Sequence, residues 1–378
     1  MSVLRPLFVI GTRPEAIKMA PLVLACAERS RQGTEPAVQP IICTTGQHRE
    51  MLAQVTDYFG IQPDVQLDVM TAGQTLADLT ARCLQGLSKT IADLQPDCIV
   101  AQGDTTTVMA AGLAAFYARL PMVHVEAGLR TGNLQAPWPE ELNRRIVSLC
   151  ATLHCAPTER AAQALRAEGV PQSRIHVTGN TVIDSLLWTV ERERQNAPAW
   201  KARHAYLAER PLVLITGHRR ENFGEGLKQL CTALAHLAAR YPHVAFVYPV
   251  HMNPQVAGPV QAALKGLANV HLIPPAAYPE FVWLMDRATV IVTDSGGVQE
   301  EAPTLGKPVL VMRDATERPE ALETGLVELV GTDSTRIIAR TSALLDGRPV
   351  VPSGAHPFGN GIAGRQIVEL IAARAWNA

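Results

Sequence analysis

Short apolar runs alternate with polar turns and amphipathic stretches along the whole chain. An apolar run of strand length that is rich in β-branched residues predicts a buried strand. Such runs occupy Leu7–Ile10, Val38–Thr44, Asp97–Ala101, Pro121–Val125, Arg174–Thr178, Leu212–Thr216, Ala245–Val250, Val270–Ile273, Thr289–Thr293 and Pro308–Met312. Helical patterns occupy Ala16–Arg29, Leu76–Leu94, Val108–Arg119, a stretch from Pro139 to about Leu153, Glu191–Arg210 and Ala363–Ala375. Strands and helices therefore alternate in both halves, which predicts two doubly wound parallel α/β sheets.

Polar residues of reactive types directly follow the predicted strands. They are Arg13, Asp104, Glu126, His218, His251 and Ser295. Each of them alone has an ordinary explanation as a helix cap or a surface residue. Because parallel strands present their carboxyl ends to ligands, six such residues in one topological position favour a shared ligand-binding cleft.

The stretch Ala288–Leu310 shows this arrangement most clearly. A predicted strand ends in the turn Asp294–Gly297, and we expect a helix to begin at Val298. The first N–H groups of a helix lack intrahelical partners and suit an anion, and glycines let a phosphate approach them closely. Glu301 lies about one turn further along, where its carboxylate could bind both hydroxyls of a ribose. From this stretch alone, an ordinary strand–turn–helix with a Ser or Asp cap is an equal alternative.

Charged side chains complete the candidate chemistry. Arg13 and Lys18 surround the start of the first predicted helix, where they would either neutralise a phosphate or remain solvated. Acid–base candidates come from both halves, Asp104, Glu126 and Glu140 from the first and His218 from the second. If the halves face each other, these groups would meet the predicted anion site.

The composition narrows the class of protein. The net charge is −1 and the charges are well mixed, so we expect neither nucleic-acid nor membrane-surface binding. An apolar fraction of 47% is typical of a globular chain. No apolar run reaches the length of a membrane span, and no signal peptide is predicted. The seven cysteines are scattered without a CxxC pair, which favours buried thiols and a cytoplasmic location.

Three kinds of site are disfavoured by the residues themselves. The first strand is not followed by GxGxxG, which counts against a bound dinucleotide. The turn Asp294–Gly297 resembles the GxSxG motif of serine hydrolases only superficially. His124 and Glu126 share one strand face, but no third ligand is spaced to join them, so we expect no metal.

A series of distinctive sequence blocks extends along nearly the whole chain. They read GTRPEAIKMAPL, GQHREML, GDTTT, HVEAGLRTG, PWPEELNR, TGNTVIDSLLW, TGHRRENFG, VYPVHMNP, TDSGGVQEEAPTLGKPVLVMRDATERPEA and LVGTD. Together they resemble the non-hydrolysing UDP-N-acetylglucosamine 2-epimerases. Several blocks exceed ten residues and stand in a fixed order, so chance agreement is negligible.

This resemblance implies a two-domain enzyme. The fold would contain two Rossmann-like domains with parallel sheets in a glycosyltransferase-B-type arrangement, with the active site in the interdomain cleft. We expect an N-terminal domain at residues 1–179, a C-terminal UDP-binding domain at 180–362, and a helix at 363–378 that packs back on the first domain. The family further implies a cytoplasmic homodimer that uses no cofactor and supplies ManNAc for surface polysaccharides.

The implied reaction is the reversible epimerisation of UDP-GlcNAc to UDP-ManNAc at C2. Because no carbonyl group adjoins C2, its proton is only weakly acidic and direct deprotonation is implausible. The family's route eliminates UDP across C1–C2 to give 2-acetamidoglucal, then adds UDP back with the proton on the other face. This route needs a base at C2 and strong stabilisation of the departing UDP.

The resemblance also assigns residues. The family's acid–base carboxylates match Asp104, Glu126 and Glu140, and its catalytic histidine matches His218. Substrate-binding positions match Arg13, Lys18, Asp104, Glu126, His218, Ala276, Phe281, Ser295, Gly296, Gly297, Glu301 and Arg318. Among these, the serine–glycine turn would hold phosphate, Glu301 the ribose and Phe281 the uracil. Which carboxylate performs which proton transfer stays open.

The chain departs from the family pattern at three places. One is the segment His356–Gly361, which stands where the family often carries NPYGDG and lacks a hydroxyl and a carboxylate of that motif. Ala276 stands where some relatives carry glutamine, so only a main-chain contact to the nucleotide would survive. Some members bind a second, allosteric UDP-GlcNAc at residues matching Gln47, His48 and His251. An arginine that assists there is Gly73 in this chain, so allosteric activation rests on the other three residues.

Other functions remain as alternatives. A UDP-sugar glycosyltransferase of the same fold would use the same phosphate turn, but it needs an acceptor pocket and one base instead of three carboxylates. An epimerase of a modified UDP-HexNAc would use the same residues with a different cleft shape. A non-catalytic nucleotide-sugar sensor would have no need of Asp104, Glu126 and His218.

Overall fold

The protein is described from a computed structural model of the chain. The structure describes residues 3–46, 49–71, 73–217, 219–347, 350 and 352–377, without the side chains of residues 49–51 and 220. The chain divides into two compact units, the first made of Met1–Ser185 with Phe358–Ala378 and the second of Leu186–Pro357. The domain boundaries expected at residues 179 and 362 stay a prediction.

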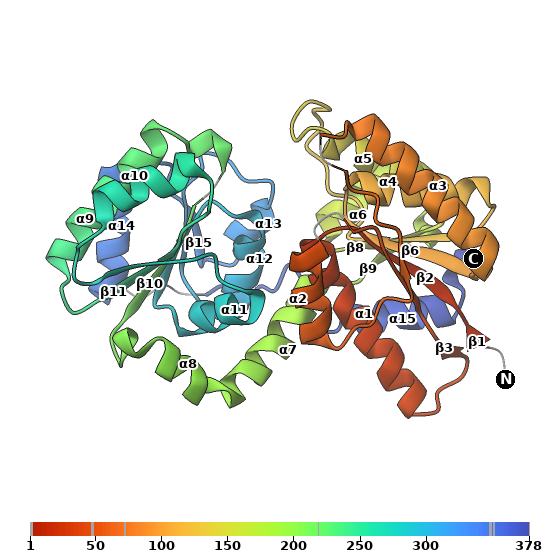
Figure 1. Ribbon diagram of the computed structural model, residues 1–378, viewed down its shortest axis with the longest axis horizontal. Coiled ribbons are helices and arrows are strands. Elements are labelled where there is room, and N and C mark those ends of the chain that lie inside the picture. The colour runs from red at the N-terminus through yellow and green to blue at the C-terminus, as the bar shows by residue number, and fades with distance from the viewer. Residues whose placement is uncertain are drawn as a thin grey trace. The chain divides into compact units, whose positions relative to one another are not determined.

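The first unit is built on a parallel sheet (Figure 1). Its seven described strands lie in the order β5-β4-β2-β6-β7-β8-β9. They are β2 Pro6–Ile10, β4 Ile41–Thr44, β5 Val65–Gln66, β6 Cys98–Gln102, β7 Met122–Val125, β8 Leu153–Ala156 and β9 Ile175–Val177. A separate parallel pair joins β1, Val3–Leu4, to β3, Ala37–Val38. Every residue of β2 and β6 is buried, because helices cover both faces of a parallel sheet.

Helices lie on both sides of this sheet (Figure 1). They are α1 Arg13–Arg31, α2 Arg49–Phe59, α3 Leu76–Leu94, α4 Thr106–Tyr117, α5 Glu140–Cys150, α6 Glu159–Ala167, η1 Gln172–Arg174, α15 Ala363–Ala372 and η4 Ala375–Asn377. Helices α3, α4 and α5 pack side by side, and α1 packs against α2 and α15. The helix α7, Thr181–Gln195, begins in the first unit and continues into the second.

The second unit has a parallel sheet of its own. Its six described strands lie in the order β12-β11-β10-β13-β14-β15. They are β10 Leu212–Thr216, β11 Ala245–Pro249, β12 Val270–Ile273, β13 Val290–Thr293, β14 Val309–Val311 and β15 Val327–Leu329. The helices are α8 Ala197–Arg203, η2 Ala205–Leu207, η3 Arg220–Asn222, α9 Glu225–Arg240, α10 Pro254–Leu264, α11 Tyr278–Arg287, α12 Gly296–Thr304, α13 Pro319–Leu322 and α14 Ser334–Leu345.

Each sheet contains a point where the strand order reverses. In the first unit the chain moves outward from β2 to β4 and β5, then returns to place β6 on the other side of β2. In the second unit it moves from β10 to β11 and β12, then returns to place β13 beside β10. Because consecutive crossovers then leave in opposite directions, a crevice opens at the carboxyl ends of these two strands. The turns after β2, β6, β10 and β13 are therefore where ligands are expected.

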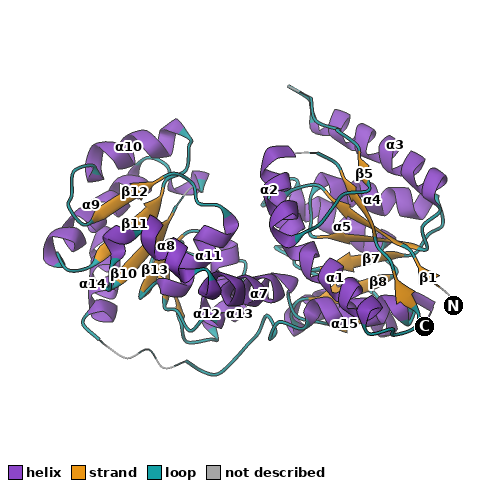
Figure 2. Cartoon of the chain, turned by 60° about the horizontal axis from the view of Figure 1, so that its bottom comes forward, coloured by secondary structure: helices purple, strands orange, loops and turns teal. Residues whose placement is uncertain are grey.

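The C-terminal helix α15 packs on α1 within the first unit, as both ribbon views show (Figures 1 and 2). The Asp184 carboxylate accepts the main-chain N–H of Gly364 at 2.8 Å, which satisfies one donor at the start of this helix. Arg29 pairs with Glu369 at 2.6 Å further along. A Cβ at Gly364 would lie 2.8 Å from the Pro21 side chain, so the two helices approach closely where glycine allows it.

Several helices and strands have bounds that differ from those predicted from the sequence. The expected strand Val38–Thr44 is two strands, β3 and β4, because Pro40 between them lacks the N–H that a continuous ladder needs. The helix expected to reach about Leu153 ends at Cys150, since Leu153 already begins β8. The helix expected at Glu191–Arg210 is divided among the end of α7, α8 and η2. The final helix ends at Ala372, short of the expected Ala375.

Two further expectations concern the class of protein. All seven cysteines are free thiols, and all except Cys150 are buried. Among the residues that the structure describes, no helix combines the length and apolar character that crossing a membrane requires.

Candidate active site

The candidate residues of the first unit lie at the reversal point of its sheet. Thr12 caps α1 and forms a reciprocal capping box with Glu15, so the helix begins at Arg13, three residues before the expected start. Arg13 is half-buried at this helix start. Gly11 must be a glycine here, because a Cβ would lie 2.6 Å from the hydroxyl of Thr107 in the first turn of α4. The turn after β2 is thus in direct contact with the start of the helix that follows β6.

Glu126 is the most extensively bonded of the predicted site residues. It directly follows β7, and its side chain is only 8% exposed. The Lys18 ammonium donates to its Oε2 at 2.6 Å, and the Gln102 amide donates to the same oxygen. The Asn180 amide donates to Oε1 at 3.2 Å. Donors from α1, from β6 and from the turn before α7 therefore converge on one carboxylate.

The backbone of Glu126 is held in an unusual conformation. Its φ of 62° lies in the left-handed region, which a residue with a side chain rarely adopts. Such a conformation costs about 1–3 kcal/mol and persists only where the surroundings enforce it, which is typical of functional sites. Gly128, two residues further along the same turn, also has a positive φ, of 95°. A Cβ at Gly128 would lie 2.2 Å from the Ala161 carbonyl oxygen. Close packing on α6 therefore fixes the turn that carries Glu126.

Asp104 is held by α5. It is not a helix cap, because Thr105 caps α4. The Arg144 guanidinium donates to Asp104 Oδ2 from Nε and Nη2, each at 2.8 Å. The Asn143 amide donates to the Asp104 carbonyl oxygen at 2.8 Å. These contacts fix the direction of a carboxylate that is 29% exposed and can reach a ligand.

Glu140 is the first residue of α5 and is half-buried. It precedes Asn143 and Arg144 by three and four residues, so it shares their helix face and lies on the side that contacts Asp104. The next residue, Glu141, is fully buried and accepts the N–H groups of Thr131 and Gly132 and a contact from Arg144 at 3.1 Å. Burial alone would raise the pKa of Glu141, but these hydrogen bonds outweigh it and lower the pKa.

Two buried groups beneath the site have strongly shifted pKa values. Burial raises the pKa of Glu15 from 4.5 to about 7, although the Gly11 N–H and neighbouring hydroxyls oppose the shift. Burial lowers the pKa of His124 from 6.5 to about 4. The His124 ring nitrogen Nε2 lies 2.7 Å from the Gly103 carbonyl oxygen, just before Asp104. At neutral pH this histidine is uncharged and supports the β6 turn as a hydrogen-bond donor.

The second unit has candidate residues of its own at the reversal point of its sheet. The turn after β13 leads into α12 at Gly296, two residues before the expected helix start. Ser295 stands at the N-cap position without a side-chain cap bond, and the turn Ser295–Gly297 is half-exposed. Glu301 points back towards this turn, since a Cβ at Gly297 would lie 3.3 Å from its Oε1. The geometry combines exposed helix N–H groups with a carboxylate one turn away.

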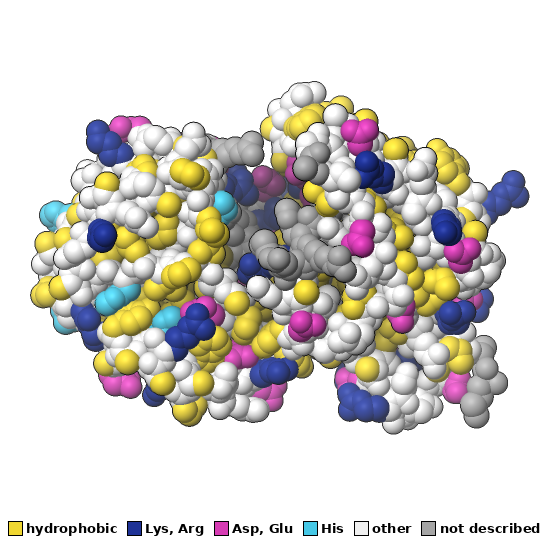
Figure 3. Space-filling model, viewed as in Figure 1, with side chains coloured by type: hydrophobic (Ala, Val, Ile, Leu, Met, Phe, Trp, Pro, Cys, Tyr) yellow, Lys and Arg dark blue, Asp and Glu magenta, His cyan; other side chains and the backbone are white. Residues whose placement is uncertain are grey.

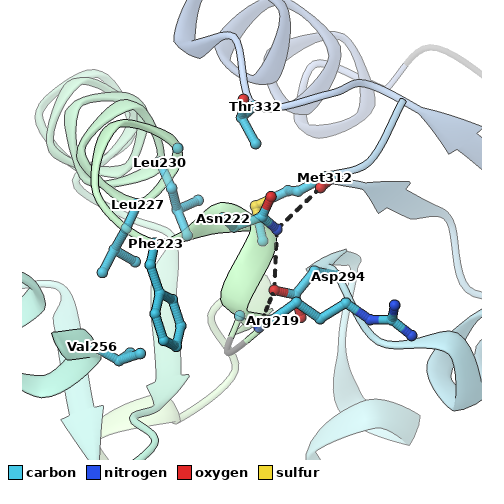
Figure 4. A pocket seen from close by; sticks show the side chains of 11 residues that line it. Arg219, Asn222, Phe223, Leu227, Leu230, Val256, Asp294, Met312 and Thr332 are labelled. Atoms are coloured by element: carbon cyan, nitrogen blue, oxygen red, sulfur yellow. Dashed lines mark hydrogen bonds between the residues drawn. The ribbon is translucent and has the colours of Figure 1, made fainter. Parts of the chain in front are cut away.

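Asp294 connects this turn to the loop after β10 (Figure 4). The fully buried Asp294 carboxylate accepts the main-chain N–H of Arg219 at 2.9 Å and the Asn222 amide at 3.2 Å. The same Asn222 amide also reaches the Met312 carbonyl oxygen at 3.2 Å. The Arg219 guanidinium extends towards α12, with Nη2 3.8 Å from the position of a Cβ on Gly296. A positive charge therefore lies beside the predicted phosphate turn.

Other predicted residues of this unit lie around the same edge. Ala276 is half-buried in the loop after β12, and Phe281 is half-buried in α11. Arg318 donates to Glu300, the buried neighbour of Glu301. His251 follows β11 and is exposed, with its Nδ1 accepting the Asn253 N–H at 3.1 Å. The predicted residues His218, Gln47 and His48 lie outside the described residues.

Four supporting residues were missed by the sequence-based assignment of roles. They are Gln102, Arg144, Asn180 and Asp294. Arg144 had a visible signal, because it stands four residues after Glu140 on one helix face. The other three bond to partners far away along the chain, and no local pattern marks such pairs.

The distribution of metal-binding and charged side chains bears on other kinds of site. In the described part of the chain, no group of three or more His, Cys, Asp or Glu side chains is arranged to hold a metal ion. On the face seen in Figure 3, basic, acidic and hydrophobic side chains are intermixed.

Two parallel doubly wound sheets, each with polar turns at its reversal point, define a two-unit α/β enzyme of the glycosyltransferase-B type. Residues 6–372 match the family model described as UDP-N-acetylglucosamine 2-epimerase. The chain belongs to this family.

Curated relatives match this chain over nearly their whole lengths. The chain is 50% identical over 376 residues to the UDP-N-acetylglucosamine 2-epimerase of Yersinia pestis, covering 97% of this chain and 98% of that one. It is 49% identical over 378 residues to the enzyme of the same name from Escherichia coli K12, with the same coverage.

Solved structures are similar over the whole chain as well. The UDP-GlcNAc 2-epimerase of Neisseria meningitidis, solved with UDP-GlcNAc bound, matches with a TM-score of 0.90 and 43% identity, covering 98% of this chain and 100% of that one. The Methanocaldococcus jannaschii enzyme, solved in complex with UDP-GlcNAc and UDP, matches with a TM-score of 0.82 and 30% identity at the same coverage.

Proposed function

We propose that this protein interconverts UDP-GlcNAc and UDP-ManNAc by inverting C2 of the sugar. The observation that carries the proposal is membership of the epimerase family over residues 6–372, with no large part of the chain left over for another activity. The carboxylates that this chemistry needs are present in the first unit, where other side chains hold Asp104 and Glu126 in defined directions.

The proposed reaction proceeds by elimination and re-addition. A base removes the C2 proton, the electrons of the C2–H bond form the C1–C2 double bond, and the C1–O bond breaks with its electrons leaving on UDP. The intermediate is 2-acetamidoglucal. In the reverse step the phosphate oxygen of UDP attacks C1, and an acid delivers a proton to the opposite face of C2. Asp104, Glu126 and Glu140 are proposed as this acid–base set.

The leaving group is UDP, so its stabilisation determines the rate of C1–O cleavage. We assign its phosphates to the helix start Ser295–Gly297, with Arg13 and His218 as further phosphate-binding groups. The ribose is assigned to Glu301 and the uracil to Phe281 and to the main chain of Ala276. Arg318 is assigned to substrate binding together with its bonded neighbour Glu300. No metal or redox cofactor enters this scheme.

We further propose that the protein works as a cytoplasmic homodimer. Large apolar side chains on α4 and α5 support a second copy as the partner, because Phe116, Tyr117 and Leu149 are 62%, 67% and 87% exposed. Light scattering of the purified protein at micromolar concentration tests this directly. A wild-type monomer would contradict the proposal, whereas a dimer that Leu149→Glu dissociates would support it.

The activity is tested with UDP-GlcNAc and the pure protein in D₂O without NAD, followed by NMR of the sugar C2 position. We expect UDP-ManNAc to appear and the C2 proton signal to be lost from both sugars. An intact C2 proton together with no new sugar would refute the assignment. UDP release that requires an added sugar acceptor would identify a glycosyltransferase, and turnover of only a substituted UDP-HexNAc would identify a modified substrate.

A further inference from the structure

Asn180 is a buried side chain beside the proposed acid–base machinery, and no role has been assigned to it. It follows β9 in the sequence Thr-Gly-Asn-Thr, immediately before α7, and is 2% exposed. Its amide nitrogen, amide oxygen and main-chain N–H each bond to a different residue. Its side chain therefore deserves a functional explanation beyond filling space.

Its main-chain carbonyl oxygen accepts the Ile183 N–H at 3.0 Å, and three further hydrogen bonds hold its side chain and its main-chain N–H. The side-chain Nδ2 donates to Glu126 Oε1 at 3.2 Å, and the side-chain Oδ1 accepts the Val182 N–H at 3.1 Å. The main-chain N–H donates to the Phe358 carbonyl oxygen at 2.8 Å. The amide orientation is set by this pattern, because only the NH₂ group can donate to a carboxylate and only the oxygen can accept an N–H.

The backbone of this turn is closely packed against the returning segment of the chain. Gly179 has a φ of 84°, and a Cβ there would lie 3.1 Å from the Phe358 carbonyl oxygen and 3.2 Å from Gly359 Cα. The segment that leads out of the first unit and the segment that returns to it are thus packed backbone to backbone at this turn. Asn180 extends from that rigid point to Glu126.

The two oxygens of Glu126 have different neighbours. Lys18 and Gln102 both donate to Oε2, whereas Asn180 donates to Oε1. Contacts to Oε2 alone would still allow the carboxylate plane to rotate about the bond to the chain. A third donor on the other oxygen removes this freedom, so the direction of the Oε1 lone pairs is fixed before a substrate binds.

We propose that Asn180 is a positioning residue that orients the Glu126 carboxylate for proton transfer at C2 through its hydrogen bond to Oε1. The proposal rests on the function proposed above, in which Glu126 belongs to the acid–base set. It also gives a physical reason for an asparagine at this position, since the site needs a donor and an acceptor on one short side chain.

A purely structural role makes a different prediction. Asparagine and aspartate are equally good at the start of a helix, because both accept a main-chain N–H. If Asn180 only caps α7, Asn180→Asp keeps the Val182 contact and should be harmless. If it positions Glu126, the same change removes the donor and sets two carboxylates about 3 Å apart, where like charges repel.

The test compares Asn180→Asp, Asn180→Ser and the control Ser185→Ala. Ser185 is a similarly buried residue of α7 whose hydroxyl donates to the Ile17 carbonyl oxygen on α1 and not to the Glu126 carboxylate. We measure kcat and KM for UDP-GlcNAc, the rate of C2 deuterium exchange in D₂O, and Tm. Asn180→Asp should lower kcat and exchange by about 100-fold and change KM by less than about threefold, because misdirection of a reacting group by about 1 Å costs that much.

The serine variant separates positioning from folding, because it keeps an acceptor near Val182 and adds no charge. We expect it to keep Tm and to lose about tenfold in kcat, whereas Ser185→Ala should keep kcat. A kcat within about threefold of the wild type for the serine variant, or equal losses in Ser185→Ala, would overturn the positioning role. A wild type that shows neither epimerisation nor exchange would instead overturn the proposed function and this inference with it.

Discussion

Replacing Arg144 tests whether one buried arginine both stabilises the first unit and directs Asp104. Arg144 is 5% exposed and connects two carboxylates, Asp104 with two contacts of 2.8 Å and Glu141 with one of 3.1 Å. The variant Arg144→Met has a similar length but neither charge nor donors. It would remove the closer of the two cations beside the fully buried Glu141, which would keep Arg145 at 3.6 Å and the N–H groups of Thr131 and Gly132.

The expected cost follows from the burial of the two acids. Removing one member of a buried ion pair costs about 3–5 kcal/mol, because the remaining charge stays desolvated. Since Asp104 is 29% exposed and can be hydrated, we expect the lower end, about 3 kcal/mol of unfolding free energy. A lysine keeps the charge but cannot span both carboxylates, so Arg144→Lys should lose less stability.

Catalysis should fall as well. Without the two contacts to its Oδ2, Asp104 is free to turn, and we expect kcat/KM to fall about 100-fold in Arg144→Met. The neighbouring Arg145 is a matched control. Its side chain is 43% exposed and lies 3.6 Å from the same buried Glu141, so solvent screens this longer contact and we expect it to contribute less than about 1 kcal/mol.

The assays are urea unfolding and steady-state epimerisation of UDP-GlcNAc, each on Arg144→Met, Arg144→Lys and Arg145→Met. If Arg144→Met unfolds within about 1 kcal/mol of Arg145→Met, the buried pair does not stabilise the unit as argued. If its kcat/KM also matches that of the control, Arg144 does not direct Asp104.

Two further predictions concern the same unit. Burial raises the pKa of Glu15 to about 7, so the folded protein holds the Glu15 proton more strongly than the unfolded chain does. The stability gained from this proton is therefore complete below pH 4.5 and is lost as the pH rises through 7. Glu15→Gln should remove that decline, which is worth about 3 kcal/mol, and equal urea midpoints for variant and wild type from pH 5 to 8 would contradict this. Gly128→Ala should cost about 3 kcal/mol or more, because the new Cβ would meet the Ala161 carbonyl oxygen at 2.2 Å. Gly33→Ala, with a φ of 65° and open space, should cost only about 1–2 kcal/mol, and similar losses in both variants would refute the packing argument.

Much of the fold could be predicted from local patterns. The apolar runs at β10, a mostly buried strand, and at β12, a half-buried edge strand, predicted both strands with the bounds observed. The amphipathic pattern of α3 likewise predicted the observed bounds of that helix. The expected start of α1 was three residues late, because the capping box of Thr12 and Glu15 extends the helix towards the strand. The short strand β8 was read as the end of a helix, since a four-residue run beside a helix carries little periodicity of its own.

The sequence predicted the proposed reacting residues of the candidate site better than the residues that hold them in place. Glu126 and Asp104 could be named because each follows a predicted strand, where parallel sheets expose functional residues. Asp294 was considered only as a cap, yet it holds the loop after β10 through Arg219 and Asn222. These two hydrogen bonds join Asp294 to residues 75 and 72 positions away along the chain. A single sequence contains no signal that pairs residues so far apart.

The sequence by itself determined the class of fold, the family and the types of side chain available for chemistry. These features follow from periodicity, turn residues and blocks of fixed order, all of which are local along the chain. Only the tertiary structure decided which donors meet each acid, that Lys18, Gln102 and Asn180 converge on Glu126, and that this residue adopts a positive φ. Such contacts arise when crossover connections bring distant turns to one edge of a sheet, and packing against neighbours then overrides local preference.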